Sequence, residues 1–361
     1  MTKGETVSME KKGLGTFQVS FILVGTIMGA GFASGREIWT YFGVFGIYGY
    51  IGLLLSIALY IFICLMATSL SKKFCTTDFG KIVSPSKNEA INNIFGYILA
   101  LVLCLVLVTM TAAGGSICSQ QFGISKVVGG LVVLVAVLVT VLGDFDRISK
   151  VFRYIMPFLM TIMVITCVFI LLSDIQNQGY TDEAVPSPFA KSWYFSSITY
   201  MCFNIYGTVP ICMITAKNAR SERVARKGII LGGTFIGVLA LLLLTVTMKD
   251  PCFSQAMDMP LLAYSQVVSK PLNLVFTITL ILAIYAAACS NYYGFIMKLK
   301  DGKNKKIIIV LTACICFLIG LVGFKNIVSY AFSLAGILGI LILILMIFNY
   351  CKFILLVQKR N

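Results

Sequence analysis

The residues with the clearest capacity for chemistry in this sequence lie together within one apolar segment. Residues 29–37 read Gly-Ala-Gly-Phe-Ala-Ser-Gly-Arg-Glu and end in adjacent opposite charges, Arg36 and Glu37. Glycine costs about 1 kcal/mol relative to alanine in a helix interior, and a charge at bilayer depth costs at least about 2.5 kcal/mol. We therefore predict a broken helix around a binding site. The solute-binding candidates here are Gly29, Ala30, Gly31, Phe32, Ser34 and Gly35.

The charge pair suggests ion coupling. Glu37 is the natural group to carry a proton or bind a cation, and Arg36 could attract an anionic solute. Structural roles compete with both interpretations, because the glycines could be packing positions between helices and the charges could anchor the segment at the membrane surface. Adjacent residues on a helix point in different directions, so no direct contact between Arg36 and Glu37 is expected.

A second polar interruption is predicted in the middle of the chain, over residues 204–210. Pro210 removes a backbone donor from this apolar run, and Gly207 loosens it further. Phe203, Asn204 and Gly207 are therefore predicted to face a solute from the side opposite residues 29–35.

Weaker candidates lie in two other apolar segments. Thr111 would contribute a hydroxyl to the solute, and Ser290 and Asn291 would offer oxygen atoms to a coupling cation such as Na⁺. Serine and threonine within membrane spans often bond only to their own backbone, so each residue also has a structural interpretation.

The composition indicates an integral membrane protein of the all-α class. Of 361 residues, 59% are hydrophobic and 12% are charged, whereas about a quarter are charged in soluble domains. Apolar stretches of about 20 residues recur, which is the length of a spanning helix. The net charge is +15, and the Lys and Arg residues lie mainly in every second gap between these stretches. This is the positive-inside pattern of membrane proteins, and it argues against nucleic-acid binding as the reason for the positive charge.

The pattern predicts ten transmembrane helices with both termini in the cytoplasm. A charge pair in a loop would leave 38–71 as one overlong span, so residues 14–46 are interpreted as a single interrupted span. The half-apolar stretch 249–270 is predicted to fold back as a lid on the outer side. The predicted spans are residues 14–46, 47–71, 91–117, 127–142, 154–172, 191–217, 228–248, 271–297, 307–324 and 327–351.

The two interrupted spans are the first and the sixth of ten. An odd unit of five spans, repeated once, sits inverted in the membrane, and broken helices at matching positions mark the solute site of secondary transporters. Unwound backbone at this depth requires a cavity, a solute or an ion to satisfy its polar groups. The predicted organisation is a tail 1–13, a first repeat 14–172, an outer loop 173–190, a second repeat 191–351 and a tail 352–361.

Residues 27–32, Ile-Met-Gly-Ala-Gly-Phe, resemble the first-helix glycine motif of the amino acid-polyamine-organocation superfamily. The longer run 29–37 is similar to the YkvI family of bacterial membrane proteins. The resemblance implies a LeuT-like fold of 5+5 inverted repeats, with the solute between helices one, three, six and eight. It also implies that backbone amides near residues 34–37 face a solute carboxylate. The better-known amino acid carriers of the superfamily generally lack the Arg36–Glu37 pair.

These features predict a secondary transporter in the cytoplasmic membrane that moves an amino acid or a related small organic solute, coupled to H⁺ or Na⁺. The alternative is a sensor that binds a solute on the same fold without moving it, as membrane subunits of spore germinant receptors are thought to do. An enzyme is not expected, because there is no histidine and no carboxylate pair in the spans. No cofactor or bound metal is expected either, and the phosphate-binding motif of ATP-driven proteins is absent.

Overall fold

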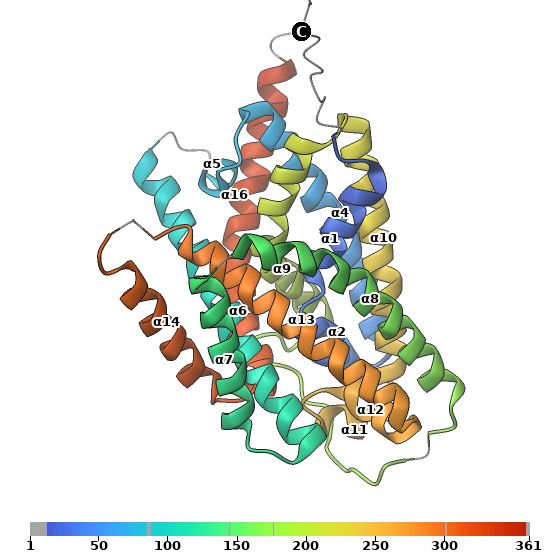
Figure 1. Ribbon diagram of the computed structural model, residues 1–361. Coiled ribbons are helices and arrows are strands. Elements are labelled where there is room, and N and C mark those ends of the chain that lie inside the picture. The colour runs from blue at the N-terminus through green and yellow to red at the C-terminus, as the bar shows by residue number, and fades with distance from the viewer. Residues whose placement is uncertain (1–12, 85–87, 144, 176, 300–301, 359–361) are drawn as a thin grey trace, which may run out of the picture.

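The computed structural model describes residues 13–84, 88–143, 145–175, 177–299 and 302–358. The predicted tail 1–13 lies outside these residues except for Gly13, as do the last three residues of the predicted tail 352–361. All elements in the described part are helices (Figure 1), and one isolated bridge joins Leu14 to Ala219. This agrees with the predicted all-α class.

Three short helical pieces at the start of the chain replace the first long helix that composition alone would suggest. These pieces are α1 (Thr16–Ile27), α2 (Ala30–Ala33) and α3 (Arg36–Tyr41). The remaining elements of the first half are η1 (Gly43–Phe45), α4 (Ile47–Phe74), α5 (Phe79–Val83), α6 (Glu89–Phe122), α7 (Lys126–Leu142) and α8 (Phe145–Leu172).

The second half repeats this alternation of long and short helices. Its elements are α9 (Trp193–Asn218), α10 (Glu222–Thr247), α11 (Pro251–Ala256), α12 (Pro260–Val268), α13 (Lys270–Ile296), α14 (Lys305–Gly320), α15 (Phe324–Asn326), the π-helical turn η2 (Ile327–Ala331) and α16 (Phe332–Gln358).

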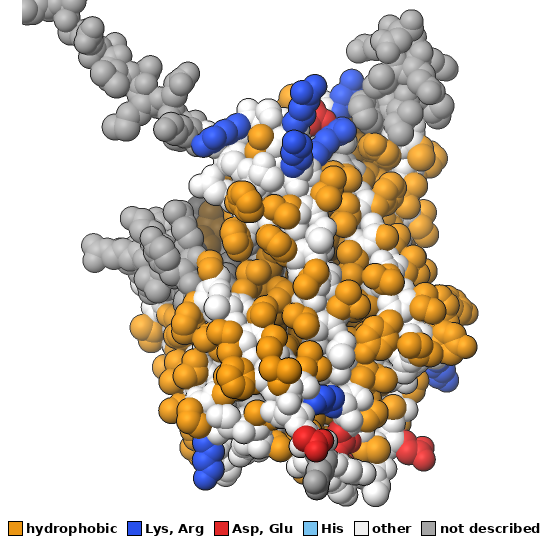
Figure 2. All heavy atoms as spheres, turned by 90° about the vertical axis from the view of Figure 1, so that its right-hand side faces the viewer, with side chains coloured by type: hydrophobic (Ala, Val, Ile, Leu, Met, Phe, Trp, Pro, Cys, Tyr) orange, Lys and Arg blue, Asp and Glu red, His pale blue; other side chains and the backbone are white. Residues whose placement is uncertain are grey.

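Six stretches of the described chain are long and apolar enough to cross a membrane. They coincide with α4, α6, α9, α10, α13 and the run Phe324–Lys352, and shorter apolar helices occur at Thr16–Ile27, Lys126–Leu142 and Pro157–Leu172. Figure 2 shows apolar side chains in a broad band between two ends where the charged side chains gather. The chain is therefore a multi-pass membrane protein, since a charge-free band of this kind suits hydrocarbon and not water.

The predicted break in the sixth span is wrong. Helix α9 runs without interruption from Trp193 to Asn218, through both Gly207 and Pro210. A proline in a membrane helix removes a single backbone hydrogen bond, and packing against neighbouring helices can hold the helix together across it. Such packing is present here, because α9 lies against α4 on one side and α16 on another.

Helix α10 lets two other helices approach its backbone closely. A Cβ atom on Gly228 would lie 2.6 Å from the Cβ of Val19 in α1, and one on Gly237 would lie 2.8 Å from Ile57 Cδ1 in α4. Helices in a membrane gain little from the hydrophobic effect when they associate, so close van der Waals packing must hold them together. Glycines at such positions allow that close packing. The interrupted first segment is thereby fixed beside α10 and α4.

The two ends of the molecule differ in architecture. Helix α1 begins and α16 ends at the top of Figure 1, while α11 and α12 lie at the opposite end, across α13. We call residues 251–268, which comprise α11, α12 and their connection, the cap. This segment corresponds to the predicted lid, and its contacts with α3 define the site described next.

Candidate functional site

The interruption predicted in the first segment is present and involves only a few residues. Helix α1 ends at Ile27, and Gly29 is extended with φ −87° and ψ −178° before α2 begins at Ala30. A second interruption follows one turn later, where Gly35 adopts the left-handed conformation with φ +78°. Left-handed backbone favours glycine because a Cβ would meet the following carbonyl. The chain therefore leaves helical geometry twice within the buried interior.

Glu37 lies directly against the first of these turns. Its side chain is 6% exposed, and Tyr200 of α9 donates a hydrogen bond to its Oε2 over 3.3 Å. The carboxyl group occupies the space where Gly31 lacks a side chain, since a Cβ on Gly31 would lie 2.6 Å from Glu37 Cδ. Gly31 is thus required for close packing of a carboxyl group and not for an unusual backbone angle.

Arg36 points away from this carboxyl group and toward the cap. Its side chain is 2% exposed, and Nη1 donates to the carbonyl oxygens of Ser254, Gln255 and Met257 over 3.2, 3.3 and 3.0 Å. The salt bridges among the described residues do not pair Arg36 with Glu37. As expected, the two charges make no salt bridge with each other, and their side chains contact different parts of the molecule.

Two further bonds join the first segment to the cap. Trp39 Nε1 donates to Gln255 Oε1 over 2.8 Å, and the backbone N–H of Leu261 donates to the carbonyl of Ser34 over 2.8 Å. Both Trp39 and Gln255 are buried, so neither partner has water as a substitute. The cap is therefore attached to the first segment through buried polar contacts.

The cap is also bound to α6 and α7. Asp258 accepts from Ser116 of α6 over 2.9 Å and forms an ion pair with Lys126 of α7 at 2.5 Å. Gln120 donates to the carbonyl of Met259 over 3.1 Å and accepts its N–H over 3.2 Å. These bonds attach the cap to two further helices at its end of the molecule, and its role as a lid on the outer side stays a prediction.

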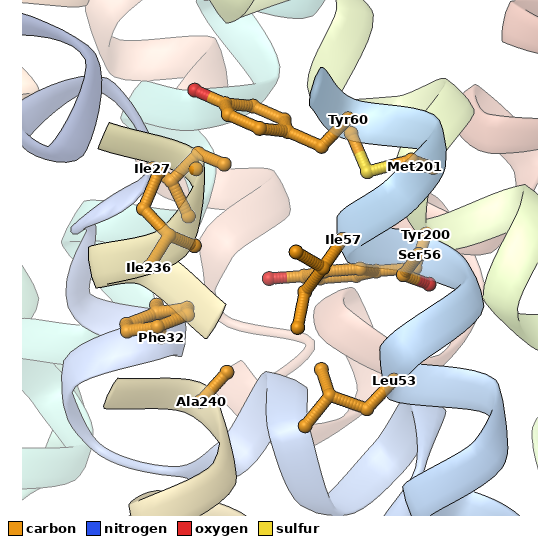
Figure 3. Close-up of a pocket in the computed structure, with 11 residues that line it drawn as sticks. Ile27, Phe32, Leu53, Ser56, Ile57, Tyr60, Tyr200, Met201, Ile236 and Ala240 are labelled. Atoms are coloured by element: carbon orange, nitrogen blue, oxygen red, sulfur yellow. The ribbon is translucent and has the colours of Figure 1, made fainter. Parts of the chain in front are cut away.

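An apolar pocket lies on the other side of the interruption, between α1, α2, α4, α9 and α10 (Figure 3). Ile27 and Phe32 flank the extended turn, and Tyr60, Tyr200 and Ile236 complete the wall. Tyr200 connects this pocket to the carboxyl group, because its ring lines the pocket and its hydroxyl binds Glu37. The lining of this small pocket is therefore apolar, and Tyr200 separates it from the buried carboxyl group.

The predicted residues of α2 lie in two places. Gly29, Ala30, Gly31 and Phe32 gather at the interruption, and Phe32 reaches the pocket. Ser34 and Gly35 face the cap instead, and a Cβ on Gly35 would lie 3.8 Å from Leu261. The resemblance implied that backbone amides near residues 34–37 face a solute carboxylate. Of these amides, the Arg36 N–H donates to Ser34 Oγ over 3.4 Å.

The predicted residues of α9 are only partly enclosed. Phe203 stacks on Phe332 of α16 with ring centres 4.1 Å apart, and Asn204 donates to the carbonyl of Tyr200 over 2.9 Å. A Cβ on Gly207 would meet nothing within 4 Å, so α9 presents an open face there. These residues follow Tyr200 along α9 but do not contact Glu37 through any hydrogen bond.

The remaining candidates are not brought to the interruption. The Thr111 hydroxyl donates to the carbonyl of Val108 over 2.9 Å and faces Gly320 of α14. Ser290 is exposed, and Asn291 donates to the carbonyl of Ala287 over 2.8 Å. Sequence reasoning missed Tyr200, because a tyrosine in an apolar helix gives no local sign that it will meet a carboxyl group 163 positions away.

Comparisons with known proteins agree with this architecture. The chain matches no family model. It is 23% identical over 334 residues to the uncharacterised membrane protein YkvI of Bacillus subtilis (strain 168), covering 91% of this chain and 94% of that protein. It is 21% identical over 325 residues to the uncharacterised protein YyaD of the same organism, covering 90% and 93% of the two chains.

Among solved structures, the chain resembles a manganese transporter of Eremococcus coleocola, in two mutant forms. Each comparison has a TM-score of 0.50 at 11% sequence identity and covers 97% of this chain and 80% of the transporter. At 11% sequence identity this similarity concerns the fold alone, and it does not identify any functional residue of this chain. The chain therefore shares the overall fold of a membrane transporter.

Proposed function

We propose that this protein is a secondary transporter that moves a small organic solute across the cytoplasmic membrane by alternating access. In this proposal it has ten spans in a LeuT-like arrangement of two inverted repeats of five. The spans are α1–α3, α4, α6, α7 and α8 in the first repeat, and α9, α10, α13, α14 and α15–α16 in the second.

Two features of the packing support the repeat. The second span of each half is followed by short helices, α5 in the first half and α11–α12 in the second. The first span of each half packs against the second span of the other, α1 against α10 and α9 against α4. Such reciprocal packing is expected when two similar units face each other in inverted orientation. Only the first repeat opens with an interrupted helix.

The observation that carries the proposal is the buried carboxyl group of Glu37 at the interruption. A buried charge is costly unless it is paired, and the partner that Glu37 has here is the Tyr200 hydroxyl. A carboxyl group in such a position is suited to bind a proton or a cation on one side of the membrane and release it on the other. We assign proton coupling to Glu37, with Na⁺ as the competing ion.

The conformation fits one state of a transport cycle. The cap covers the end that we assign to the outside and is bonded to α3, α6 and α7 there. With both termini in the cytoplasm, this is a state closed to the outside. Reopening would require the cap to leave Ser34, Arg36 and Trp39, which hold it to the first segment.

The solute is assigned as organic, with an amino acid or a relative as the leading class. The described residues include no group of three or more His, Cys, Asp or Glu that could hold a metal ion. Divalent manganese prefers several carboxylate and other oxygen ligands, and Glu37 alone does not supply them. The pocket beside Tyr200 has an apolar lining, which is compatible with the apolar part of an organic solute but leaves room only for a small group in this conformation.

The test is solute uptake into proteoliposomes that contain the purified protein. Radiolabelled amino acids would be offered under an imposed pH gradient and, separately, under a Na⁺ gradient. Accumulation that follows the pH gradient is expected for the wild type, and Glu37→Gln should remove its dependence on pH. Glu222→Gln is the matched control, because Glu222 is half exposed and pairs with Lys72 and Arg226.

Two results would count against the proposal. Solute binding without accumulation under either gradient would favour a sensor on the same fold. Uptake whose pH dependence is unchanged in Glu37→Gln would return Glu37 to a structural role and leave the coupling to another group.

A further inference from the structure

Arg36 uses only one edge of its guanidinium group. Nη1 contacts the three carbonyl oxygens of the cap named above, whereas Nε and Nη2 have no acceptor among the residues that the structure describes. Nε is fully enclosed, which makes it an unpaired donor in the interior. Leaving a buried donor unpaired is costly, and the cost is larger when the group is charged. This edge therefore lacks a partner that its position requires.

A second cation lies at the same place. Lys325 of α15 is half-buried, and its Nζ donates over 2.6 Å to the carbonyl oxygen of Gln255, which Arg36 Nη1 also contacts at 3.3 Å. Two positive groups that share one carbonyl oxygen repel each other strongly in a medium of low dielectric constant. A neutral carbonyl does not cancel that repulsion, so an anion is needed.

The protein's own anions do not fill this need. Asp258 is close enough to act electrostatically on both Arg36 and Lys325, but its carboxylate is bound by Lys126 at 2.5 Å and Ser116 at 2.9 Å. Asp182 acts on Lys325 and is not bonded to either cation. Among these charged groups, three cations (Arg36, Lys126 and Lys325) face two carboxylates (Asp182 and Asp258), of which only Asp258 is bonded to one of them, so the local surplus is positive.

We propose that the Nε–Nη2 edge of Arg36, together with the Lys325 ammonium group, forms a binding site for the carboxylate of a small solute beneath the cap. The guanidinium edge presents two parallel N–H donors, and this spacing matches the two oxygens of a carboxylate. A carboxylate offers one oxygen to each of the two donors, whereas a spherical anion such as chloride must share a single acceptor between them. The site is distinct from the apolar pocket, which lies on the Glu37 side of α3.

The site gives α3 two functions. Arg36 serves this site on the cap side, while Glu37 lies away from it, against Gly31 and Tyr200. The binding itself does not depend on the transport proposal, because it requires only the groups at the cap. Acetate is a suitable probe, since it presents a carboxylate and little else.

The experiment measures the melting temperature of the purified full chain in detergent at pH 7 while sodium acetate replaces sodium chloride at constant ionic strength. A ligand that binds the folded state stabilises it in a saturable way. We expect saturable stabilisation of the wild type. In Arg36→Lys the apparent affinity should fall by about tenfold or more, because one charge-assisted hydrogen bond is lost while the charge stays. Lys325→Gln should also weaken binding.

Lys249→Gln is the matched control. Lys249 lies at the same end of the molecule and its Nζ contacts three backbone carbonyls, of Ile170, Leu171 and Ser173, but it does not touch the cap carbonyl at Gln255. Its acetate dependence should equal that of the wild type. If Arg36→Lys does not fold, the comparison of Lys325→Gln with Lys249→Gln decides the matter in the same assay.

The inference is overturned if acetate has no saturable effect relative to chloride on the wild type, or if Lys325→Gln and Arg36→Lys respond to acetate as the wild type does. Acetate binding in a protein that accumulates no solute in proteoliposomes would support the site and refute transport. Transport in a protein whose melting temperature does not respond to acetate would support the transport proposal and refute the carboxylate site.

Discussion

Replacing Gly31 with alanine should disturb Glu37 more than any other single methyl group added at the interruption. The new Cβ would lie 2.6 Å from Glu37 Cδ and 2.7 Å from Cγ, and closer still to Oε1. Real Cβ atoms do not approach other heavy atoms so closely, so the carboxyl group must leave its position. Its hydrogen bond from Tyr200 would be lost with it.

The magnitude follows from three contributions. Overpacking of a close contact costs about 1–3 kcal/mol, and loss of the hydrogen bond to the carboxyl group costs about 1–2 kcal/mol. Alanine in place of a helical glycine returns about 0.5–1 kcal/mol. We therefore expect Gly31→Ala to lower the free energy of unfolding by about 2–3 kcal/mol. Gly29→Ala is the control, because its Cβ would meet only Met110 Cε at an ordinary 3.5 Å.

The assay is a double-mutant cycle on purified protein, with unfolding followed in mixed detergent micelles. Gly31→Ala is measured in the wild type and again in Glu37→Ala, where the side chain that it would strike is absent. The cost of Gly31→Ala should shrink by about 1–3 kcal/mol in the second background, as expected for residues in direct contact. Equal costs in the two backgrounds, or equal stability of Gly31→Ala and Gly29→Ala, would refute the reasoning.

Three further predictions concern the interruption, α9 and the cap. Gly35→Ala should cost about 1–2 kcal/mol in unfolding measurements, because its φ of +78° is left-handed; a stable variant would mean that this turn is not rigid. Gly207→Ala should be neutral or raise stability by about 0.5–1 kcal/mol, since its Cβ meets nothing within 4 Å, and a marked fall would contradict an unbroken α9. Trp39→Phe should cost about 1–3 kcal/mol and speed proteolysis of the cap, because the oxygen of Gln255 loses its donor. Trp193→Phe, which loses no hydrogen bond within the described chain, should change neither quantity if this assignment is correct.

Local composition was sufficient to predict which segments lie in the membrane and where the first of them is interrupted. Hydrophobic length identifies helices in a membrane because hydrocarbon leaves no other way to satisfy the backbone. The interruption near Gly29 was likewise visible, because three glycines and a charge pair oppose a helix within one short run. The cap was predicted from residues 249–270 because a half-apolar stretch is suited to neither water nor a full span.

The same local signals failed where packing outweighs propensity. Gly207 and Pro210 predicted a break, yet α9 stays helical because α4 and α16 pack along it and a proline removes only one hydrogen bond. The Thr111 hydroxyl bonds to its own helix and faces α14, which the sequence could not specify. A polar residue in a span reveals its type in the sequence but not its direction.

The sequence by itself determined that this chain crosses the membrane repeatedly and that its first segment is broken beside two charges. Only the tertiary structure decided what those charges do. Arg36 finds its cap carbonyls 218 to 221 positions away, and Glu37 finds Tyr200 at a separation of 163. The physical reason is that hydrophobic patterning reports whether a residue meets lipid or water, whereas a buried polar partner is chosen by helix packing across the whole chain.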